Sequence, residues 1–470
     1  MSAAVDRLLR RVPSPASTIS PEFDLARAGG IAPEDSVAFH RGRLFVLSDL
    51  HGGRMLHEYS AGRLAVQPDA GAWIHSLEST ARLTAWNSSP TNENMTATDY
   101  NNGRWTVDRE RVKSFPTVSS LHHPDEPLVF QSRRVSPGVS ACRVLRDDGT
   151  VMARWRCALM GRGFWFDNML WYTDEVWPSQ VLVGRGGDDF AVLTRHQLPP
   201  GILSSLVSDG SVVAGIWSDP GTPASLLTAG SVGELADTVA AFAETSDPRP
   251  YRSHCGTIED LPCVVYTPRI SVVGTVLVLH GGPHSLNWPV FSPLIGYLCE
   301  SGWRVVAPNV SSSAMGSRET DVESEYGVDD ANDVTRLATA FSDGPVAVVG
   351  WSYGAYLAAR AVALGLRCAG IVSLGGFFSP EAINEAHPAV GAFLRAYRLP
   401  RTDSGDIAHV PVLAVHGRHD TRIKVDVHRD YVRRLRFGTF VELPDDGHLI
   451  ITDAGAAIAY PALAAWLAGL

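Results

Sequence analysis

The stretch VVGWSYGAYLAAR, from Val348 to Arg360, decides how the second half of the chain is interpreted. A strand-like apolar run ends at Gly350, Ser352 follows between this glycine and a second one, and an alanine-rich helical segment comes next. Glycines are expected where neighbouring backbone leaves no room for a Cβ and the serine adopts a strained turn. This strand-turn-helix context predicts a nucleophile elbow, which holds a serine hydroxyl within reach of a substrate. A plain turn, with Ser352 capping the helix, is the alternative.

The region around this stretch, residues 251–470, alternates apolar strands with helical segments. The strands TVLVLHGG, WRVVAPN, PVAVVGW, CAGIVSLGG, VPVLAVHG and FGTFVELP are continuous apolar runs rather than alternating ones. Such runs indicate a mostly parallel sheet with helices on both faces. In these sheets, sites gather where loops leave the carboxyl ends of the strands.

A serine hydroxyl is a poor nucleophile until a base takes its proton and an acid orients that base. Behind a nucleophile elbow, the acid and then the base follow the serine along the chain, in loops after later strands. Asp420 follows the strand VPVLAVHG, and His448 follows FGTFVELP. The sequence therefore predicts Ser352, Asp420 and His448 as a catalytic triad.

Several nearby residues compete for these roles. Asp445 and Asp446 lie too close to His448 to come from the loop that should supply the acid. A helix N-cap is the alternative role for Asp420. The remaining histidines in these loops are expected to form structural hydrogen bonds; they are His284, His416 and His419.

Acyl transfer also needs donors for the oxyanion that forms during the reaction. The backbone N–H of Tyr353, directly after the serine, is the first expected donor. The second is the Gly282 N–H in the HGGPH loop, where glycines let the backbone approach a substrate.

The whole chain has the composition of an ordinary globular protein: 470 residues, 45% of them hydrophobic and 19% charged. A formal net charge of -10 argues against nucleic acid or an anionic membrane as a partner. No signal peptide and no membrane-spanning run is expected. The six scattered cysteines fit free thiols in the cytoplasm, and no metal site or cofactor is predicted.

The first half of the chain is expected to be all β. Residues 21–245 form short alternating runs broken by turn residues, and the first helical period comes at SVGELADTVAAF. About 225 residues would supply roughly five blades of a short or irregular β-propeller, and a pair of β-sandwiches is the alternative. The segments LSDLHGG (47–53) and GRGGDD (184–189) are interpreted as turns, and the aromatic run from Phe164 to Trp177 as core between blades.

The motifs HGGPHS, EYGVDDANDV and GWSYGAY, with the Asp420 loop and Gly447-His448, resemble the prolyl oligopeptidase family of serine peptidases, especially its acylaminoacyl-peptidase and dipeptidyl-peptidase-like branches. The resemblance covers residues 251–470. It implies a β-propeller over an α/β-hydrolase domain, with the site between them and access limited to short peptides. It also implies that residues 1–20 pack on the hydrolase domain.

Two features depart from the family pattern. Met315 stands near the place of a tyrosine that completes the oxyanion hole in many members. Loss of one such donor typically lowers the rate by about 100- to 1000-fold, so Gly282 or a hydroxyl among residues 311–313 would have to compensate. The β region is also too short for the seven or more blades usual in the family.

The sequence therefore predicts a serine hydrolase that cleaves amide bonds of short peptides. An esterase or acyltransferase that acts on a small molecule or modified peptide would use the same residues. A catalytically inactive binding or scaffold protein is the alternative from another class, suggested by Met315 and the short β region.

Overall fold

The computed structural model describes residues 119–470 apart from 124, 137–138, 245–248, 314–325, 342, 386–396, 404, 421 and 451–452, together with eight short strands between residues 23 and 106. The predicted packing of residues 1–20, the LSDLHGG turn beyond Ser48 and the position of Met315 lie outside these residues.

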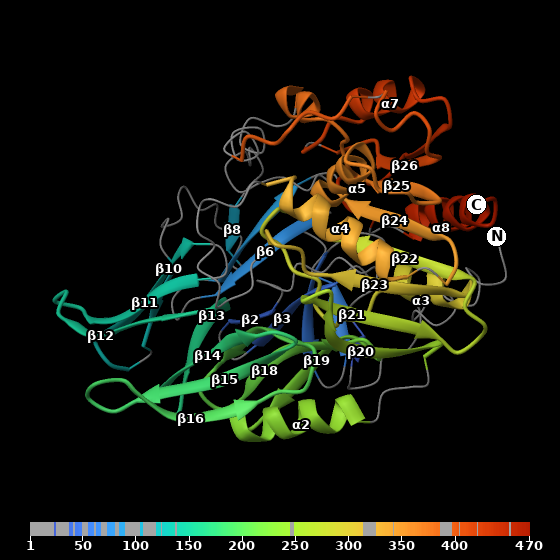
Figure 1. Ribbon diagram of the computed structural model, residues 1–470. Helices are drawn as coiled ribbons and strands as arrows, with labels where there is room; N and C mark the ends of the chain where they lie inside the picture. Colours follow the sequence, from blue (N-terminus) through green and yellow to red (C-terminus); the bar gives the residue numbers. More distant parts are fainter. Residues whose placement is uncertain are drawn as a thin grey trace.

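In the described part of the first half, the chain forms five antiparallel sheets (Figure 1). In chain order their strands are β2 (Val37–His40), β3 (Arg43–Ser48), β4 (Met55–Ser60) and β5 (Arg63–Val66); β6 (Trp73–Ser79), β7 (Thr84–Ser89) and β8 (Arg104–Thr106); β9 (Ser119–His122), β10 (Leu128–Ser136), β11 (Val139–Arg146) and β12 (Val151–Cys157); β13 (Leu159–Phe166), β14 (Met169–Val176), β15 (Ser179–Gly186) and β16 (Ala191–Gln197); β17 (Ile202–Ser208), β18 (Val213–Asp219) and β19 (Thr222–Ala229).

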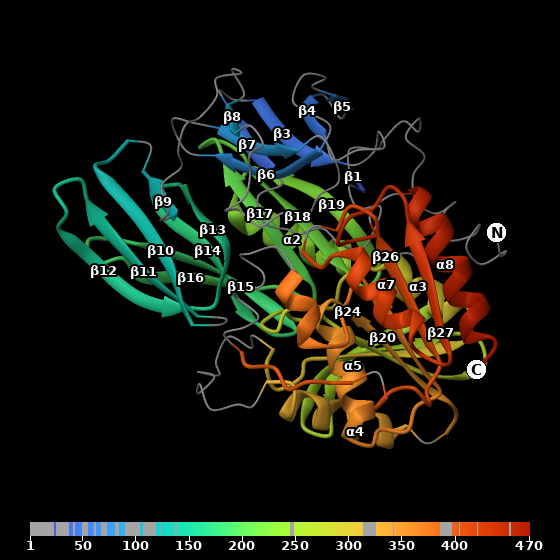
Figure 2. The same ribbon diagram turned by 90° about the horizontal axis from the view of Figure 1, so that it is seen from above.

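The two ends of this β region meet. β1 (Phe23–Asp24) pairs antiparallel with β19 and becomes the fourth strand of the last sheet. The first strand of the last sheet, β17, contacts β2 of the first sheet, and β2 contacts β6 in turn. Sheets that follow one another and close on the N-terminal strand form a short β-propeller, as predicted (Figure 2).

The aromatic side chains of β13 and β14 lie in the core between sheets. Phe164 and Trp171 pack with Trp217 from the last sheet, and Tyr172 packs with Phe130 from β10. These residues are buried, which confirms their interpretation as core. Trp177, at the end of the same aromatic run, differs: it is partly buried and packs against the core of the second half rather than between sheets of the first. The GRGGDD segment contains the last three residues of β15 and the start of the hairpin turn that joins β15 to β16, in agreement with the predicted turn.

The helix α2 (Val232–Glu244) covers the last sheet of the β region and ends close to the connection into the second half. The two halves then meet at a seam of polar contacts. Trp177 Nε1 donates to the Asn287 carbonyl at 3.1 Å, and Tyr251 Oη donates to the Pro220 carbonyl at 2.6 Å. The turn after β14 therefore contacts the segment that follows the HGGPHS motif.

The second half contains an eight-stranded sheet with the order β20-β21-β23-β22-β24-β25-β26-β27. β20 and β21 run antiparallel to their neighbours, and the remaining pairs are parallel. The strands are β20 (Tyr251–Ile258), β21 (Leu261–Pro268), β22 (Gly274–Leu279), β23 (Trp303–Pro308), β24 (Val346–Trp351), β25 (Gly370–Leu374), β26 (Val412–Gly417) and β27 (Gly438–Leu443).

Helices cover both faces of this sheet because each central strand is apolar on both sides. Val346 and Val348 of β24 face one core, whereas Ala347 and Val349 face the other. The first core is closed by α4 (Asp329–Ala340), α5 (Tyr353–Ala363) and α7 (Val425–Arg433), and the second by α3 (Pro293–Glu300) and α8 (Asp453–Leu467). A 3-10 helix, η1 (Pro380–Glu385), follows β25.

None of the helices in the described ranges combines the length and the apolar content that a membrane crossing requires.

Candidate active site

The GxSxG segment forms a sharp turn between β24 and α5. Ser352 has φ 51° and ψ -112°, a conformation in which non-glycine residues are strained. A Cβ on Gly350 would lie 2.3 Å from the Gly354 backbone, and one on Gly354 would lie 2.5 Å from the Leu279 carbonyl oxygen. Both glycines are therefore required by close backbone contacts, as the sequence predicts.

The alternative role of Ser352 as a helix cap does not agree with the structure. Ser352 occupies the N-cap position of α5, but its side chain forms no capping hydrogen bond. Among the described residues, no hydrogen-bond partner of the Ser352 hydroxyl is found, and the residue is only partly buried. The strained turn thus presents a hydroxyl that no other group in the described ranges holds.

Asp420 and His448 come together from the loops after β26 and β27. His448 Nδ1 lies 2.8 Å from Asp420 Oδ2, and both side chains are buried. The two loops approach closely because Gly417 has no side chain: a Cβ there would lie 2.1 Å from the Gly447 carbonyl oxygen. These two residues of the predicted triad are therefore paired in the structure.

The other oxygen of Asp420 is held by the backbone. Oδ1 accepts hydrogen bonds from the N–H groups of Arg422 and Ile423 at 2.8 and 2.9 Å. Burial alone would raise the pKa of Asp420, but the adjacent His448 and His416 imidazoles lower it below its ordinary value. Asp420 is not the cap of α7, because the N-cap position of that helix is Lys424.

Burial lowers the pKa of His448 below its ordinary value, and the Asp420 carboxylate offsets this effect only in part. His448 is therefore neutral at neutral pH, with its Nδ1–H directed to the carboxylate. A neutral imidazole with this tautomer leaves Nε2 as a proton acceptor.

The loop after β25 lies between the serine and the histidine. A Cβ on Gly375 would lie 2.6 Å from the His448 carbonyl oxygen, and one on Gly376 would lie 3.2 Å from the Ser352 carbonyl oxygen. Ser352 N–H also donates to the Leu374 carbonyl at 3.1 Å. Ser352 and His448 thus flank the same glycine pair at the carboxyl ends of the parallel strands. Within the described residues no hydrogen bond joins their side chains, and such bonds often tighten only when substrate is bound.

The HGGPH loop after β22 lies against the serine. A Cβ on Gly281 would be 3.4 Å from Ser352 Cβ, and Gly282 has φ +127°, which favours glycine. Among the described residues, neither the Gly282 N–H nor the Tyr353 N–H has a hydrogen-bond acceptor. Both amides are thus available to a ligand beside Ser352.

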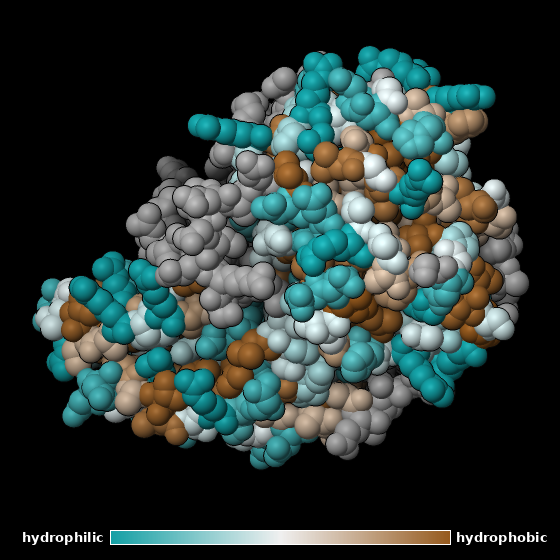
Figure 3. Space-filling model, in the orientation of Figure 1, coloured by the Kyte–Doolittle hydropathy of each residue, from teal (hydrophilic) through white to brown (hydrophobic). Residues whose placement is uncertain are grey.

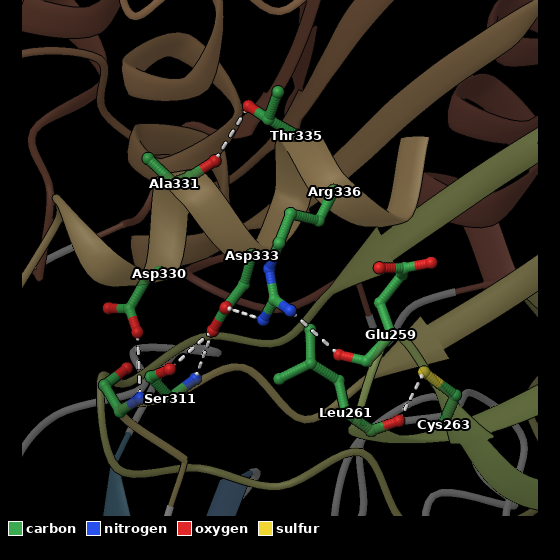
Figure 4. A network of polar contacts seen from close by, with 10 residues as sticks. Glu259, Leu261, Cys263, Ser311, Asp330, Ala331, Asp333, Thr335 and Arg336 are labelled. Atoms are coloured by element: carbon green, nitrogen blue, oxygen red, sulfur yellow. Dashed lines mark hydrogen bonds and ion pairs between the residues drawn. The ribbon is translucent and has the colours of Figure 1, made fainter. Parts of the chain in front are cut away.

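Two of the serines between residues 311 and 313 are engaged in structural hydrogen bonds. Ser311 Oγ donates to Asp333 Oδ2 at 2.6 Å, and Ser313 Oγ lies 2.6 Å from His280 Nε2. Figure 4 shows Ser311 beside the first turns of α4, where Asp333 also pairs with Arg336.

Sequence reasoning gave no role to Asp330, a buried carboxylate at the start of α4. Its Oδ2 accepts from Tyr353 Oη at 2.7 Å, and its Oδ1 accepts from the Ser312 N–H at 2.8 Å. Asp330 therefore ties the residue after the nucleophile to the segment after β23. The acidic run EYGVDDANDV is the only sequence signal of this contact, and it does not reveal the partners.

The competing residues have other partners. His416 Nε2 bonds to Asp420 Oδ2 at 2.9 Å, and His284 Nδ1 lies 3.1 Å from the Ser312 carbonyl oxygen. Asp446 accepts through its backbone carbonyl from the His419 N–H. The carboxylate that contacts His448 is that of Asp420, so neither Asp445 nor Asp446 takes its place.

On the face that Figure 3 shows, hydrophilic and hydrophobic residues are mixed over the second half of the chain.

Comparison with known proteins agrees with the fold described above. A family model described as alpha/beta hydrolase fold matches residues 274–393. No curated protein matches the sequence. The chain is similar to the solved structure of a Mycobacterium tuberculosis puromycin-hydrolyzing peptidase, with 15% identity and a TM-score of 0.59 over 92% of this chain and 85% of that one.

Two further solved structures are similar over most of their length. For a puromycin hydrolase, the identity is 14% and the TM-score 0.61 over 96% of this chain and 88% of that one. For the Pyrococcus horikoshii acylaminoacyl peptidase, the identity is 12% and the TM-score 0.58 over 91% of this chain and 86% of that one.

The second half of the chain is thus an α/β-hydrolase domain. With the β-propeller before it, the chain has the fold of the prolyl oligopeptidase family, which confirms the family resemblance at the level of the fold.

Proposed function

We propose that this protein is a serine hydrolase that cleaves amide bonds of short peptides through an acyl-enzyme intermediate. The observation that carries the proposal is the 2.8 Å contact between His448 Nδ1 and Asp420 Oδ2, at the same sheet edge as the strained Ser352. A buried acid and base pair beside a partly exposed serine, at a sharp strand-to-helix turn, has the parts of a catalytic triad.

In this mechanism Ser352 Oγ attacks the substrate carbonyl while His448 Nε2 takes its proton. Asp420 holds the imidazole through Nδ1–H and stabilises the imidazolium that forms. The N–H groups of Tyr353 and Gly282 donate to the oxyanion of the tetrahedral intermediate. His448 then gives the proton to the leaving amine, and a water molecule activated by the same imidazole releases the acyl group from Ser352.

The peptide substrate is supported by the fold and by the similar structures. Three of these structures are described as a puromycin-hydrolyzing peptidase, a puromycin hydrolase and an acylaminoacyl peptidase, and all three match both halves of this chain. The propeller contacts the segment after the HGGPHS motif through Trp177, so it stands beside the loops that would bind substrate. A propeller in this place would allow only short or flexible peptides to reach the site.

The test is incubation with a diverse library of short peptides, read by mass spectrometry, with wild type beside Ser352→Ala. We expect cleavage products from wild type and none above background from the variant. A parallel set of acyl esters, with and without an added amine, separates hydrolysis of esters and acyl transfer from peptide cleavage. Turnover of esters alone would contradict a peptide substrate and favour an esterase or acyltransferase. No turnover of either set would favour a binding or scaffold protein.

A further inference from the structure

A second buried histidine contacts the acid of the proposed triad. His416, at the end of β26, places Nε2 2.9 Å from Asp420 Oδ2, the same oxygen that receives His448 Nδ1. The His416 side chain is fully buried. The mechanism given above uses Asp420 and His448 but assigns no role to this imidazole.

The surroundings of His416 fix its tautomer. Nε2 lies near two acceptors, Asp420 Oδ2 and the Ile423 carbonyl at 2.9 Å, so this nitrogen carries a proton. Nδ1 is buried and has no hydrogen-bond partner among the described residues. A second proton on Nδ1 would be an unsatisfied buried donor, which is unfavourable. His416 is therefore a neutral donor to the carboxylate.

The groups that pack around His416 supply no second anion. His428 of α7 lies 5.4 Å away between ring centroids, and its pKa is held well below the ordinary value by burial, so it is neutral. The Phe440 ring of β27 stacks at 6.4 Å. Glu442, the strand partner of His416 in the sheet, is itself paired with Arg418 and Arg429. Asp420 is the one carboxylate bonded to His416 in the described part of the chain.

Asp420 is thus shared. Its Oδ1 accepts from two backbone N–H groups, and its Oδ2 accepts from two imidazoles. A donor on Oδ2 holds the carboxylate in place and reduces the negative charge that His448 experiences. The two histidines therefore compete for one oxygen atom.

We propose that His416 is a positioning residue that shares the Asp420 carboxylate with His448 and thereby keeps His448 neutral at weakly acidic pH. The proposal deepens the function proposed above and rests on it for its catalytic meaning. In this role, His416 sets the lower end of the pH range in which the base can accept a proton. If His416 only stabilised the loop, replacing it would change the stability of the protein but not the pKa of His448.

The direction of the effect follows from the charge. Without the His416 donor, Asp420 acts on His448 with its full negative charge, which favours the imidazolium. The measured pKa of His448 should then rise, by about one unit in His416→Leu. Because the free base is the active form, the acidic limb of kcat/KM against pH should move upward by the same amount. His416→Gln keeps an N–H donor at the same distance from the main chain and should retain most of the wild-type behaviour.

The test measures the titration of His448 by NMR in protein labelled with ¹⁵N at histidine, with His448→Gln to assign the signal. His428→Gln is the matched control, since this buried histidine neighbours His416 and its Nε2 bonds to Ser373 Oγ. We expect the shift in His416→Leu, and neither His416→Gln nor His428→Gln should show it. A His448 titration in His416→Leu that coincides with wild type would overturn the proposal.

The same samples are also treated with a fluorophosphonate, which reports on the proposed hydrolase function separately. If the His448 titration shifts in His416→Leu but the wild-type protein takes up no label, the two histidines share the carboxylate, but the protein is not a serine hydrolase. If the wild-type protein takes up label but the His448 titration does not shift in His416→Leu, the hydrolase function is supported and the proposed role of His416 is wrong.

Discussion

At the scale of single residues, the turn around Ser352 shows why the GxSxG pattern was informative. Both glycines contact backbone atoms at distances that leave no room for a side chain, and Ser352 itself has a positive φ. The constraint on Gly350 comes from Gly354, four residues along the chain, and is open to prediction from the local pattern. The constraint on Gly354 comes from the Leu279 carbonyl oxygen of β22 and follows only from the expected strand-turn-helix context. The pairing of Asp420 with His448 was also predictable, because it follows from chain order in a parallel sheet.

Replacing either glycine of the elbow should destabilise the protein. A Cβ on Gly350 would meet backbone atoms at 2.3 Å and must displace them, so Gly350→Ala should lower the free energy of unfolding by about 3 kcal/mol. The measurement is urea unfolding followed by circular dichroism. Gly405→Ala is the matched control, because a Cβ there meets no atom within 4 Å. Equal stability of the two variants would contradict the close contacts described.

The role of His416 marks the limit of prediction at this scale. A structural hydrogen bond was expected, but its partner, the Asp420 carboxylate, was not. A histidine four residues before an aspartate is compatible with many geometries. In the structure, the turn in which Asp420 Oδ1 accepts from the Arg422 and Ile423 N–H groups leaves Oδ2 facing the His416 imidazole.

At the scale of elements, α4 connects the elbow to the segment after β23. Asp330 in its first turn accepts from Tyr353 Oη and from the Ser312 N–H, so one buried carboxylate links three segments. Burial raises the pKa of Asp330, and the hydrogen bonds of Tyr353 and Ser312 offset this only in part. The arrangement fixes Tyr353, whose backbone N–H is a proposed oxyanion donor.

Removing the Tyr353 hydroxyl tests this link. Tyr353→Phe leaves the backbone N–H in place but takes one donor from the buried Asp330, so we expect a loss of about 2 kcal/mol in stability. If Asp330 also orients the oxyanion donor, kcat should fall about tenfold with little change in KM. Tyr356→Phe is the matched control, because that hydroxyl donates to the Pro400 carbonyl and not to Asp330. Unchanged kcat in Tyr353→Phe would limit Asp330 to a role in folding.

The elements of the second half were more predictable than those of the first. Continuous apolar strands alternating with helical segments indicate a parallel sheet, and β22 to β27 form as expected. In the β region, the sequence indicated short strands but could not show how the sheets close. β1 has only two residues, and its partner in β19 lies about 200 residues further along the chain. A pairing so short and so distant leaves no local pattern.

At the scale of the whole molecule, buried histidines make stability depend on pH. Burial lowers the pKa of His280 to about 4 and lowers that of His428 and His448 below the ordinary value of about 6.5. The unfolded chain therefore takes up protons below about pH 6.5 that the folded chain does not. Stability rises with pH wherever the unfolded state binds more protons, so the folded protein should lose stability as the pH falls through this range.

For His280 and His428, the slope should approach about 1.4 kcal/mol per pH unit for each histidine once the pH lies below the pKa of the unfolded chain. Urea unfolding at pH values from 7 down to 5 measures it. His428→Gln should reduce the slope by the contribution of one histidine and leaves the residues of the proposed triad unchanged. A stability that stays constant over this range would contradict the neutral state assigned to the three imidazoles.

The central claim is that Ser352 is a nucleophile activated by His448 and Asp420. The most direct measurement is covalent labelling with a fluorophosphonate, followed by mass spectrometry of the peptide that contains Ser352. We predict one label on Ser352 in wild type, no label in Ser352→Ala, and labelling slower by at least about 1000-fold in His448→Gln. A wild-type protein without label, or a Ser352→Ala variant that labels as strongly as wild type, would contradict the account.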